Sequence, residues 1–185
     1  MLEIEIKCPI KDLAAMRRQL DDLGWTKIKA QDEVDAYFNA PDRDFAQTDE
    51  AVRLRRIGPQ NILTYKGPKV DSVSKSRKEC EVPLQDGAAA ASALWDLMTA
   101  LHYRLTGEVR KHRAFYHPIV PGAFPVELCL DDVVDLGGYV ELEIKAPAEA
   151  RAAAVEYLQN LAQGLGLSHT ERRSYLELLQ AKKQG

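Results

Sequence analysis

The chain has 185 residues, of which 45% are hydrophobic and 29% are charged, and its formal net charge is −3 at pH 7. This balance argues against a protein that binds nucleic acid non-specifically, because such binding needs a general surplus of lysine and arginine. No apolar run approaches the roughly 20 residues of a membrane-spanning helix, and no basic and then apolar leader opens the chain. We therefore expect a cytoplasmic protein with a single domain over residues 1–185 and neither a nucleic-acid nor a membrane partner.

The first predicted strand covers residues 1–7 and carries a charged face and an apolar face. Side chains alternate sides along a strand, so Glu3, Glu5 and Lys7 share one face and the intervening aliphatic residues share the other. An antiparallel strand with one solvated face gives the same alternation, so this stretch alone does not distinguish a surface from a lined interior.

A helix and a second strand are expected next. Asp12 is a suitable N-cap for a helix with one apolar face that ends at Gly24. The run 31–39 then predicts a strand, which the turn former Pro41 closes.

Residues 51–57 and 62–66 are expected to form a hairpin around a Gly-Pro turn. The first of these strands places Arg53 and Arg55 on one face, and Lys66 ends the second. The basic residues of the hairpin therefore recur at the same period of two as the charges of the opening strand.

The segment 67–76 is rich in loop formers and long enough to predict a mobile loop. A strand resumes at Arg77, with Glu79 and Glu81 on the same face. An alanine-rich helix is expected to follow Gly87.

The charged alternation continues in the second half of the chain. One stretch places Lys111 and Arg113 together, and the predicted strand 125–131 places Glu127 and Asp131 on one side. The final strand is predicted over residues 139–145 and repeats the opening almost residue for residue, with Glu141, Glu143 and Lys145 in place of Glu3, Glu5 and Lys7.

Two helices are expected to end the chain. Pro147 suits the first position of a helix that Gly164 ends. The last helix is expected to begin at the capping-box pattern Ser168 to Glu171 and to present Tyr175.

Two architectures explain a face made almost wholly of lysine, arginine, aspartate and glutamate. One is a wide antiparallel sheet whose charged face is solvated, with helices on its back. The other is an α+β fold in which about eight antiparallel strands close into a barrel, with the charged faces inward and the helices packed outside. Charges are not buried without partners, so such an interior implies contents: basic side chains suit a polyphosphate, and clustered carboxylates suit Mg²⁺ or Mn²⁺.

Several motifs in order resemble one known family. They are the ExExK run from Glu3 to Lys7, Tyr37-Phe38, the run Leu63 to Pro68, and the Ser174-Tyr175 tail. Together they are similar to the CYTH superfamily, also called triphosphate tunnel metalloenzymes, and within it to the class IV adenylate cyclases. The resemblance covers nearly the whole chain.

The resemblance implies a fold and a set of roles. The fold is a closed tunnel of eight antiparallel strands that holds a triphosphate and a divalent metal ion, Mg²⁺ or Mn²⁺. Carried over by position, the metal ligands are Glu3, Glu5 and Glu141, with Glu143 and Asp131 assisting. The phosphate-binding residues are Lys7, Arg53, Arg55, Lys66, Arg77, Lys111 and Arg113, and those nearest the chemistry are Lys7, Arg113 and Glu141.

The expected activity is conversion of ATP to cyclic AMP and pyrophosphate. Hydrolysis of inorganic tripolyphosphate or of thiamine triphosphate would use the same tunnel, and the phosphate-binding groups do not separate these reactions. A module that binds such a ligand without turnover and a purely structural sheet are further alternatives. A homodimer is compatible with the sequence, since an apolar helix face or barrel rim could support one.

Overall fold

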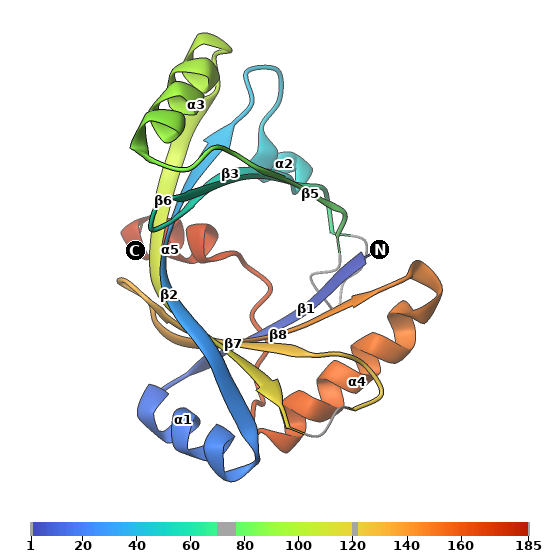
Figure 1. Cartoon of the computed structure of the whole chain (residues 1–185). Helices are drawn as coiled ribbons and strands as arrows, with labels where there is room; N and C mark the ends of the chain where they lie inside the picture. The colour runs from blue at the N-terminus through green and yellow to red at the C-terminus, as the bar shows by residue number, and fades with distance from the viewer. Residues whose placement is uncertain (1, 70–76, 120–121, 185) are drawn as a thin grey trace.

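The structure, a computed structural model, describes residues 2–69, 77–119 and 122–184 (Figure 1). Within these ranges eight strands form one sheet in the order β1-β8-β7-β6-β2-β3-β4-β5, and every neighbouring pair is antiparallel. The strands are β1 (Leu2–Ile10), β2 (Trp25–Asn39), β3 (Ala51–Ile57), β4 (Gln60–Lys66), β5 (Glu79–Pro83), β6 (Arg104–Pro118), β7 (Glu127–Val133) and β8 (Gly137–Ala146).

The sheet curls into an open half-barrel, so the predicted closed barrel is not confirmed. Its two edge strands, β1 and β5, face each other across the gap in Figure 1, and the described parts of the chain join them only at the isolated bridge between Glu3 and Arg77. The strand β5 has five residues and ends in Pro83, which has no N–H to donate. Its free edge therefore offers few hydrogen-bonding groups to an additional strand. Residues 70–76 of the predicted mobile loop lie outside the described residues.

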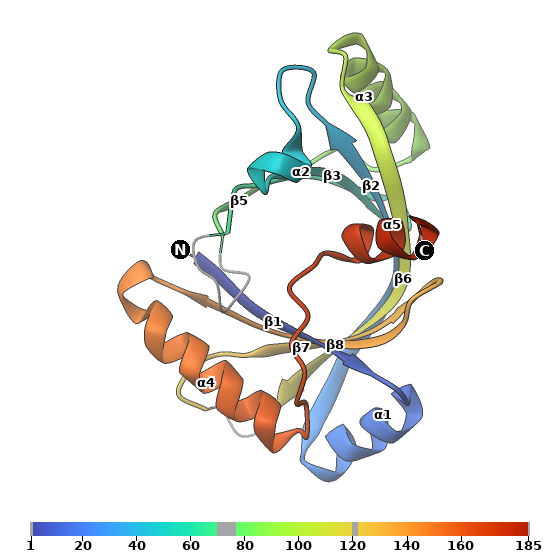
Figure 2. The ribbon, with the colours of Figure 1, turned by 180° about the vertical axis from the view of Figure 1, so that it is seen from behind.

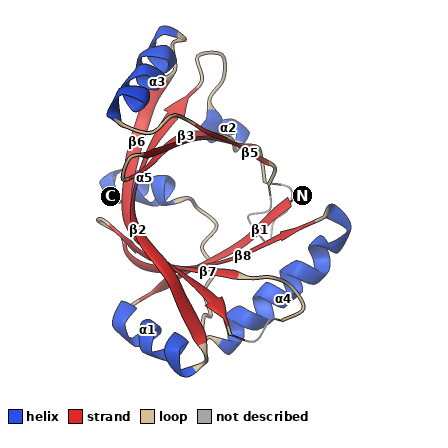
Figure 3. Cartoon of the chain, viewed as in Figure 1, coloured by secondary structure: helices blue, strands red, loops and turns tan. Residues whose placement is uncertain are grey.

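The helices α1, α3 and α4 pack on the outer surface of the curled sheet (Figure 3), whereas α5 packs against inward-facing side chains such as Val109 and Tyr139. The helices are α1 (Leu13–Asp22), α2 (Phe45–Thr48), α3 (Ala88–Ala100), α4 (Arg151–Gly164) and α5 (Tyr175–Gln184), with a short 3₁₀ helix at Ala148–Ala150. None of the helices in the described part of the chain has the length and apolar character to cross a membrane.

The main hydrophobic core lies between the outer face of the sheet and the helices α1 and α4. Ile4 of β1, Leu128 of β7, Leu142 of β8 and Leu158 of α4 all belong to it and are fully buried. Burying one such side chain contributes about 1.5–3 kcal/mol. The aliphatic faces of the alternating strands therefore point outward to the helices, which leaves the charged faces pointing inward, as the barrel hypothesis predicted.

Several strands extend beyond their predicted limits, whereas β3 has the predicted bounds and β5 begins at Glu79 instead of Arg77. The strand β2 begins at Trp25 instead of residue 31, and its pairing with β6 shifts register between Lys27 and Lys29 and again between Tyr37 and Phe38. Such irregularities bend a long strand and let it follow a curved wall. The strand β1 continues through Pro9, which an edge strand tolerates because one of its sides makes no ladder.

The starts of the last two helices differ from the prediction. Pro147 is the N-cap of the 3₁₀ helix, and α4 begins only at Arg151. The helix α5 begins at Tyr175, not near Ser168, because a second capping box lies at Ser174: the Glu177 N–H donates to Ser174 Oγ at 3.1 Å, and the Ser174 N–H donates to Glu177 Oε2 at 2.5 Å.

Candidate functional site

A cavity of about 240 Å³ lies inside the curled sheet and is lined mainly by charged side chains. All seven predicted phosphate-binding residues line it, and so do four of the five predicted metal ligands, Glu3, Glu5, Glu141 and Glu143. Lys69 and Arg172 also line it. Sequence reasoning missed these two because they lie in loops, where no alternation reveals which way a side chain points.

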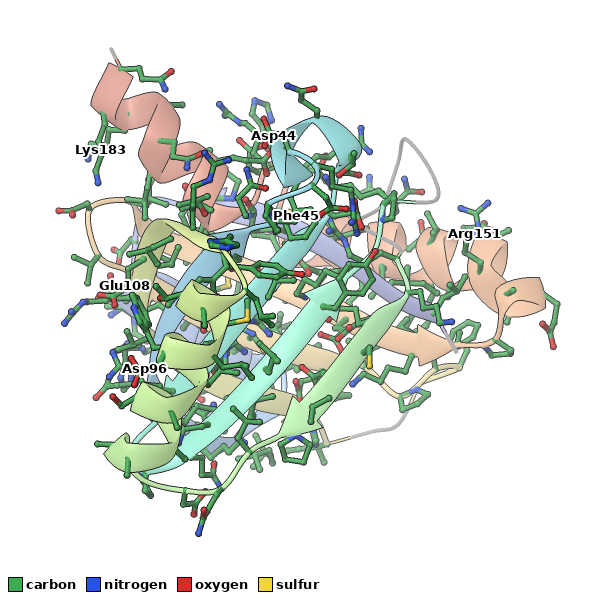
Figure 4. The ribbon with its side chains drawn as sticks, turned by 90° about the horizontal axis from the view of Figure 1, so that it is seen from above. Asp44, Phe45, Asp96, Glu108, Arg151 and Lys183 are labelled. Carbon is green, nitrogen blue, oxygen red and sulfur yellow. The ribbon has the colours of Figure 1, made fainter. Side chains whose placement is uncertain are left out.

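Two helices, α2 and α5, contribute side chains to the lining of the cavity. The short helix α2, whose Asp44 and Phe45 are labelled in Figure 4, supplies lining residues, and α5 supplies others, including Tyr175 and Gln180. Asn39 ties the start of α2 to the end of β2, because its Oδ1 accepts from the Phe45 N–H at 2.8 Å and its Nδ2 donates to Asp44 at 3.0 Å.

Antiparallel pairing sets most of the interior cations opposite carboxylates on the neighbouring strand. Side chains at paired positions share a face, so opposite charges there meet directly. Five such pairs line or back the cavity: Lys7 with Glu141, Lys111 with Glu33, Arg55 with Asp35, Arg113 with Asp131, and Lys66 with Glu79. In contrast, Glu5 faces Glu143, and Glu143 faces Glu127 on its other side.

Sequence reasoning missed the two buried carboxylates of β2. Arg55 donates from Nε and Nη2 to the two oxygens of Asp35, each at 2.7 Å, and its Nη2 lies 3.0 Å from Glu33 Oε2. Lys111 Nζ lies 3.1 Å from the same Glu33 oxygen. The alternation within residues 31–39 puts both acids on one face, so the signal that found the other charges was present here too.

The cations around these two acids keep them ionised. Burial alone would raise the pKa of Glu33, but Lys111, Arg113 and Arg55 together lower it to about 2. Burial likewise opposes ionisation of Asp35, and the pKa of that carboxyl is nevertheless held below its usual range by Arg53, Lys111 and Arg55. The ionised carboxylates of Glu33 and Asp35 therefore neutralise part of the positive charge that lines the cavity.

Asp131 lies behind the cavity and holds Arg113. Arg113 donates from Nε and Nη2 to the two Asp131 oxygens at 2.7 and 2.5 Å, and its Nη2 also contacts Glu141. The Tyr175 hydroxyl donates to Asp131 Oδ2 at 2.8 Å. Three donors thus occupy the carboxylate of Asp131, which is fully buried and does not line the cavity.

Lys7 is buried where the C-terminal segment crosses one end of the half-barrel, in front of β1, β7 and β8 in Figure 2. Its Nζ donates to the Arg173 carbonyl at 2.5 Å and lies 4.1 Å from the centre of the Tyr175 ring. The Glu171 N–H donates to the Lys7 carbonyl at 2.7 Å. The segment before α5 is therefore bound to the charged strand that opens the chain.

Lys66 and Arg77 stand at the side of the cavity near the gap in the sheet. Lys66 Nζ lies 2.5 Å from Glu79 Oε1, while burial and then the charge of Arg53 lower the pKa of Lys66. Arg77 Nη2 lies 3.9 Å from Asp49 Oδ1. Both predicted phosphate-binding residues thus face the cavity with an acidic neighbour.

The carboxylates of β1 and β8 repel one another. Burial, a hydrogen bond with Glu143 and the charge of Glu143 together raise the pKa of Glu3 to about 7. Burial also raises the pKa of Glu143, to which Glu5 adds its repulsion. No three acidic, imidazole or thiol groups in residues 2–69, 77–119 and 122–184 come close enough together to hold an ion. As a donor set, however, crowded carboxylate oxygens fit a hard divalent cation, which would relieve their repulsion.

Comparison with known proteins gives consistent matches. The CYTH domain family model matches residues 1–175. The Methanocaldococcus jannaschii protein named "Putative adenylate cyclase MJ0240" is 35% identical over 181 residues, which cover 96% of this chain and 98% of that protein.

Solved structures have the same fold. The PH1819 protein from Pyrococcus horikoshii superposes with a TM-score of 0.85 at 34% identity, over 97% of this chain and 99% of that one. HpAC1 from Hippeastrum, described as a "putative adenylyl cyclase" that "reveals a dominant" triphosphatase activity, superposes with a TM-score of 0.68 over 98% of this chain and 95% of that one. At 18% identity this second likeness extends to the fold alone.

Proposed function

Because the chain belongs to the CYTH domain family, we propose that it is a divalent-metal-dependent enzyme acting on a triphosphate, and specifically a class IV adenylate cyclase that converts ATP to cyclic AMP and pyrophosphate. The observation that carries this proposal is the gathering of the seven predicted phosphate-binding cations and four of the predicted metal-binding carboxylates around one cavity. Guanidinium groups bind phosphate oxygens in bidentate fashion, and ammonium groups act as point charges, so the two kinds together suit a chain of phosphates.

Arg53 is the cation best placed to bind a phosphate directly. It faces Tyr37 and Thr64 across its neighbouring strands, and its carboxylate contacts are distant, 3.7 Å to Asp35 and 3.8 Å to Glu81. Its Nε is buried and has no hydrogen-bond partner among the described residues. A buried donor without a partner is costly, and a phosphate oxygen would satisfy it.

Glu3, Glu5, Glu141 and Glu143 would hold Mg²⁺ or Mn²⁺ in this enzyme. When bound, the cation would lower the pKa of the attacking hydroxyl and offset the charge of the phosphates. Glu3 would have to release its proton first, since its pKa is about 7.

In the proposed reaction the ribose 3′-oxygen forms a bond to the α-phosphorus while the bond from that phosphorus to the bridging oxygen of pyrophosphate breaks. Lys7 and Arg113 would stabilise the charge that develops on the departing pyrophosphate. Tyr175 is not the base that takes the hydroxyl proton, because burial raises its pKa well above the usual value and its O–H already donates to Asp131. Asp131 and Tyr175 would instead hold Arg113 in place.

A product assay tests the proposal. The purified protein would be incubated with ATP, inorganic tripolyphosphate and thiamine triphosphate in parallel, each with Mg²⁺, with Mn²⁺ and with a chelator. Metal-dependent cyclic AMP and pyrophosphate are the expected products. Phosphate release from tripolyphosphate or thiamine triphosphate without any cyclic AMP would overturn the cyclase assignment in favour of hydrolysis, and the absence of product from all three would overturn the enzyme assignment.

A further inference from the structure

A second hollow, of about 430 Å³, is lined by residues at the end of β6, at and just before the start of β7, and in β8. Phe124, Pro125 and Val126 give it an apolar side, and Glu127 and Lys145 give it a charged side. Glu143 lines both this hollow and the charged cavity, so the two spaces adjoin.

We propose that this hollow binds an amino-substituted aromatic ring attached to the triphosphate, which makes the protein selective for organic triphosphates over inorganic tripolyphosphate. The proposal rests on the proposed function, because it assumes that the phosphates occupy the charged cavity. Adenine of ATP and the aminopyrimidine of thiamine triphosphate share the required chemistry, an aromatic face and an exocyclic amine.

The strand β8 runs from the charged cavity toward the second hollow. Glu141 lies opposite Lys7, near the end that the C-terminal segment crosses, whereas Lys145 lies opposite Glu3. At about 3.3 Å per residue, Lys145 is about 13 Å from Glu141 along the strand. A triphosphate held by the cations near α5 would therefore direct its organic substituent past the carboxylates and toward the second hollow.

The walls of the hollow suit a flat ring. Phe124 packs against Tyr157 of α4, with ring centres 5.6 Å apart and planes at 60°, so its orientation is supported from outside. A supported aromatic face beside Pro125 and Val126 can stack on a heterocycle, which is worth about 1–3 kcal/mol per base where such stacking has been measured.

Glu127 supplies the polar contact. Its side chain is 40% exposed, the His117 Nε2 lies 3.7 Å from Oε2, which is longer than a hydrogen bond, and the Cys129 thiol donates only weakly to Oε1, at 3.8 Å. The Glu127 carboxylate can therefore accept a hydrogen bond from an exocyclic amine. A site that hydrogen-bonds one substrate group rejects ligands lacking that group, so the carboxylate would discriminate against a ring that has lost its amine.

The test measures selectivity in the full-length chain. Calorimetry with Mg²⁺ would give affinities for α,β-methylene ATP, which cannot lose pyrophosphate, for its inosine counterpart, for thiamine triphosphate and for inorganic tripolyphosphate. In Phe124→Ala the ratio of the Kd for the ATP analogue to that for tripolyphosphate should rise about tenfold relative to the unaltered protein, in line with the loss of one stacked ring. Leu101→Ala, an exposed apolar position that lines neither space, is the matched control and should leave this ratio unchanged.

Glu127→Gln tests the amine contact and guards against misfolding of the Phe124 variant. This substitution should lower the affinity for the ATP analogue several-fold and leave the affinity for the inosine analogue unchanged, since inosine has no exocyclic amine. The inference would be overturned if the variants lost affinity for the ATP analogue and for tripolyphosphate to the same extent, or if they lost no affinity for either organic ligand. Failure of the unaltered protein to bind any of the four ligands would overturn the proposed function instead.

Discussion

The buried carboxylate of Glu33 makes a quantitative prediction about stability. Its side chain is fully buried between Arg55 and Lys111, and Gln31 donates to its other oxygen at 2.7 Å. Glu33→Gln keeps the shape of the side chain but removes its charge. Arg55 and Lys111 would then share the remaining charge of Asp35 with Arg53, and a buried excess of positive charge destabilises the folded state.

The magnitude follows from the pKa of Glu33, which the surrounding cations, against the effect of burial, lower from 4.5 to about 2. This depression corresponds to about 3 kcal/mol of stability. Because the folded-state pKa lies below the unfolded value, the contribution is fully present above pH 4.5 and is lost as the pH falls toward 2. At pH 7 we expect Glu33→Gln to cost about 3 kcal/mol, or about 6–12 °C in Tm for a chain of this size.

Urea unfolding from pH 7 down to pH 3 would measure the difference. The curves for the two proteins should converge at low pH, since protonation removes the same charge that the substitution removes. Glu108→Gln on β6 is the matched control: its partner Arg110 is exposed, and an exposed ion pair contributes about 0–1 kcal/mol. A loss below about 1 kcal/mol at pH 7, or a loss that does not shrink with acid, would refute the electrostatic reasoning.

Three further predictions concern the carboxylates and the start of α5. Glu5→Ala should abolish metal-dependent turnover and leave a cooperative urea transition, because it removes a proposed ligand and no core contact; a fully active variant would contradict the metal role. The affinity for Mn²⁺ should fall about tenfold from pH 8 to pH 6, because Glu3, with a pKa of about 7, must deprotonate; calorimetry would show proton release, and an affinity independent of pH would count against this site. Ser174→Ala should lower the free energy of unfolding by about 1 kcal/mol in urea titrations. The double variant Ser174→Ala/Glu177→Ala should lose less free energy of unfolding than the sum of the two single losses, because the two side chains form one cap. Strictly additive losses would argue against the reciprocal cap.

The inward and outward faces of the strands could be predicted from the sequence because alternation is a local property. A strand that is apolar on one side must bury that side, so Ile4 and Leu142 meet the helices, and Lys7 and Glu141 must then point into the interior. No long-range information is needed for that step. It explains why the predicted cations and most of the predicted metal ligands line a single cavity.

The features that were not predicted depend on contacts between distant residues. Ser168 and Ser174 each begin a Ser-x-x-Glu pattern, and local signals do not rank them. The choice of Ser174 goes with the bond from the Glu171 N–H to the Lys7 carbonyl, which holds the preceding residues in an extended segment. The roles of Glu33 and Asp35 likewise depend on the register of β2 against β6 and β3, which the pattern of β2 alone does not contain.

Cross-strand pairing gives an independent reason to place the proposed metal ion at β1 and β8. The interior cations mostly face carboxylates, so the sheet can neutralise its own charges at paired positions. The line of Glu5, Glu143 and Glu127 across three strands does not follow this rule, and like charges directly opposite one another destabilise a sheet. Burial, and then the charges of Glu5 and Glu127, raise the pKa of Glu143 at the centre of this line. A divalent cation would remove the repulsion and bring charge to the boundary between the phosphate cavity and the second hollow, where the α-phosphorus of an organic triphosphate would lie.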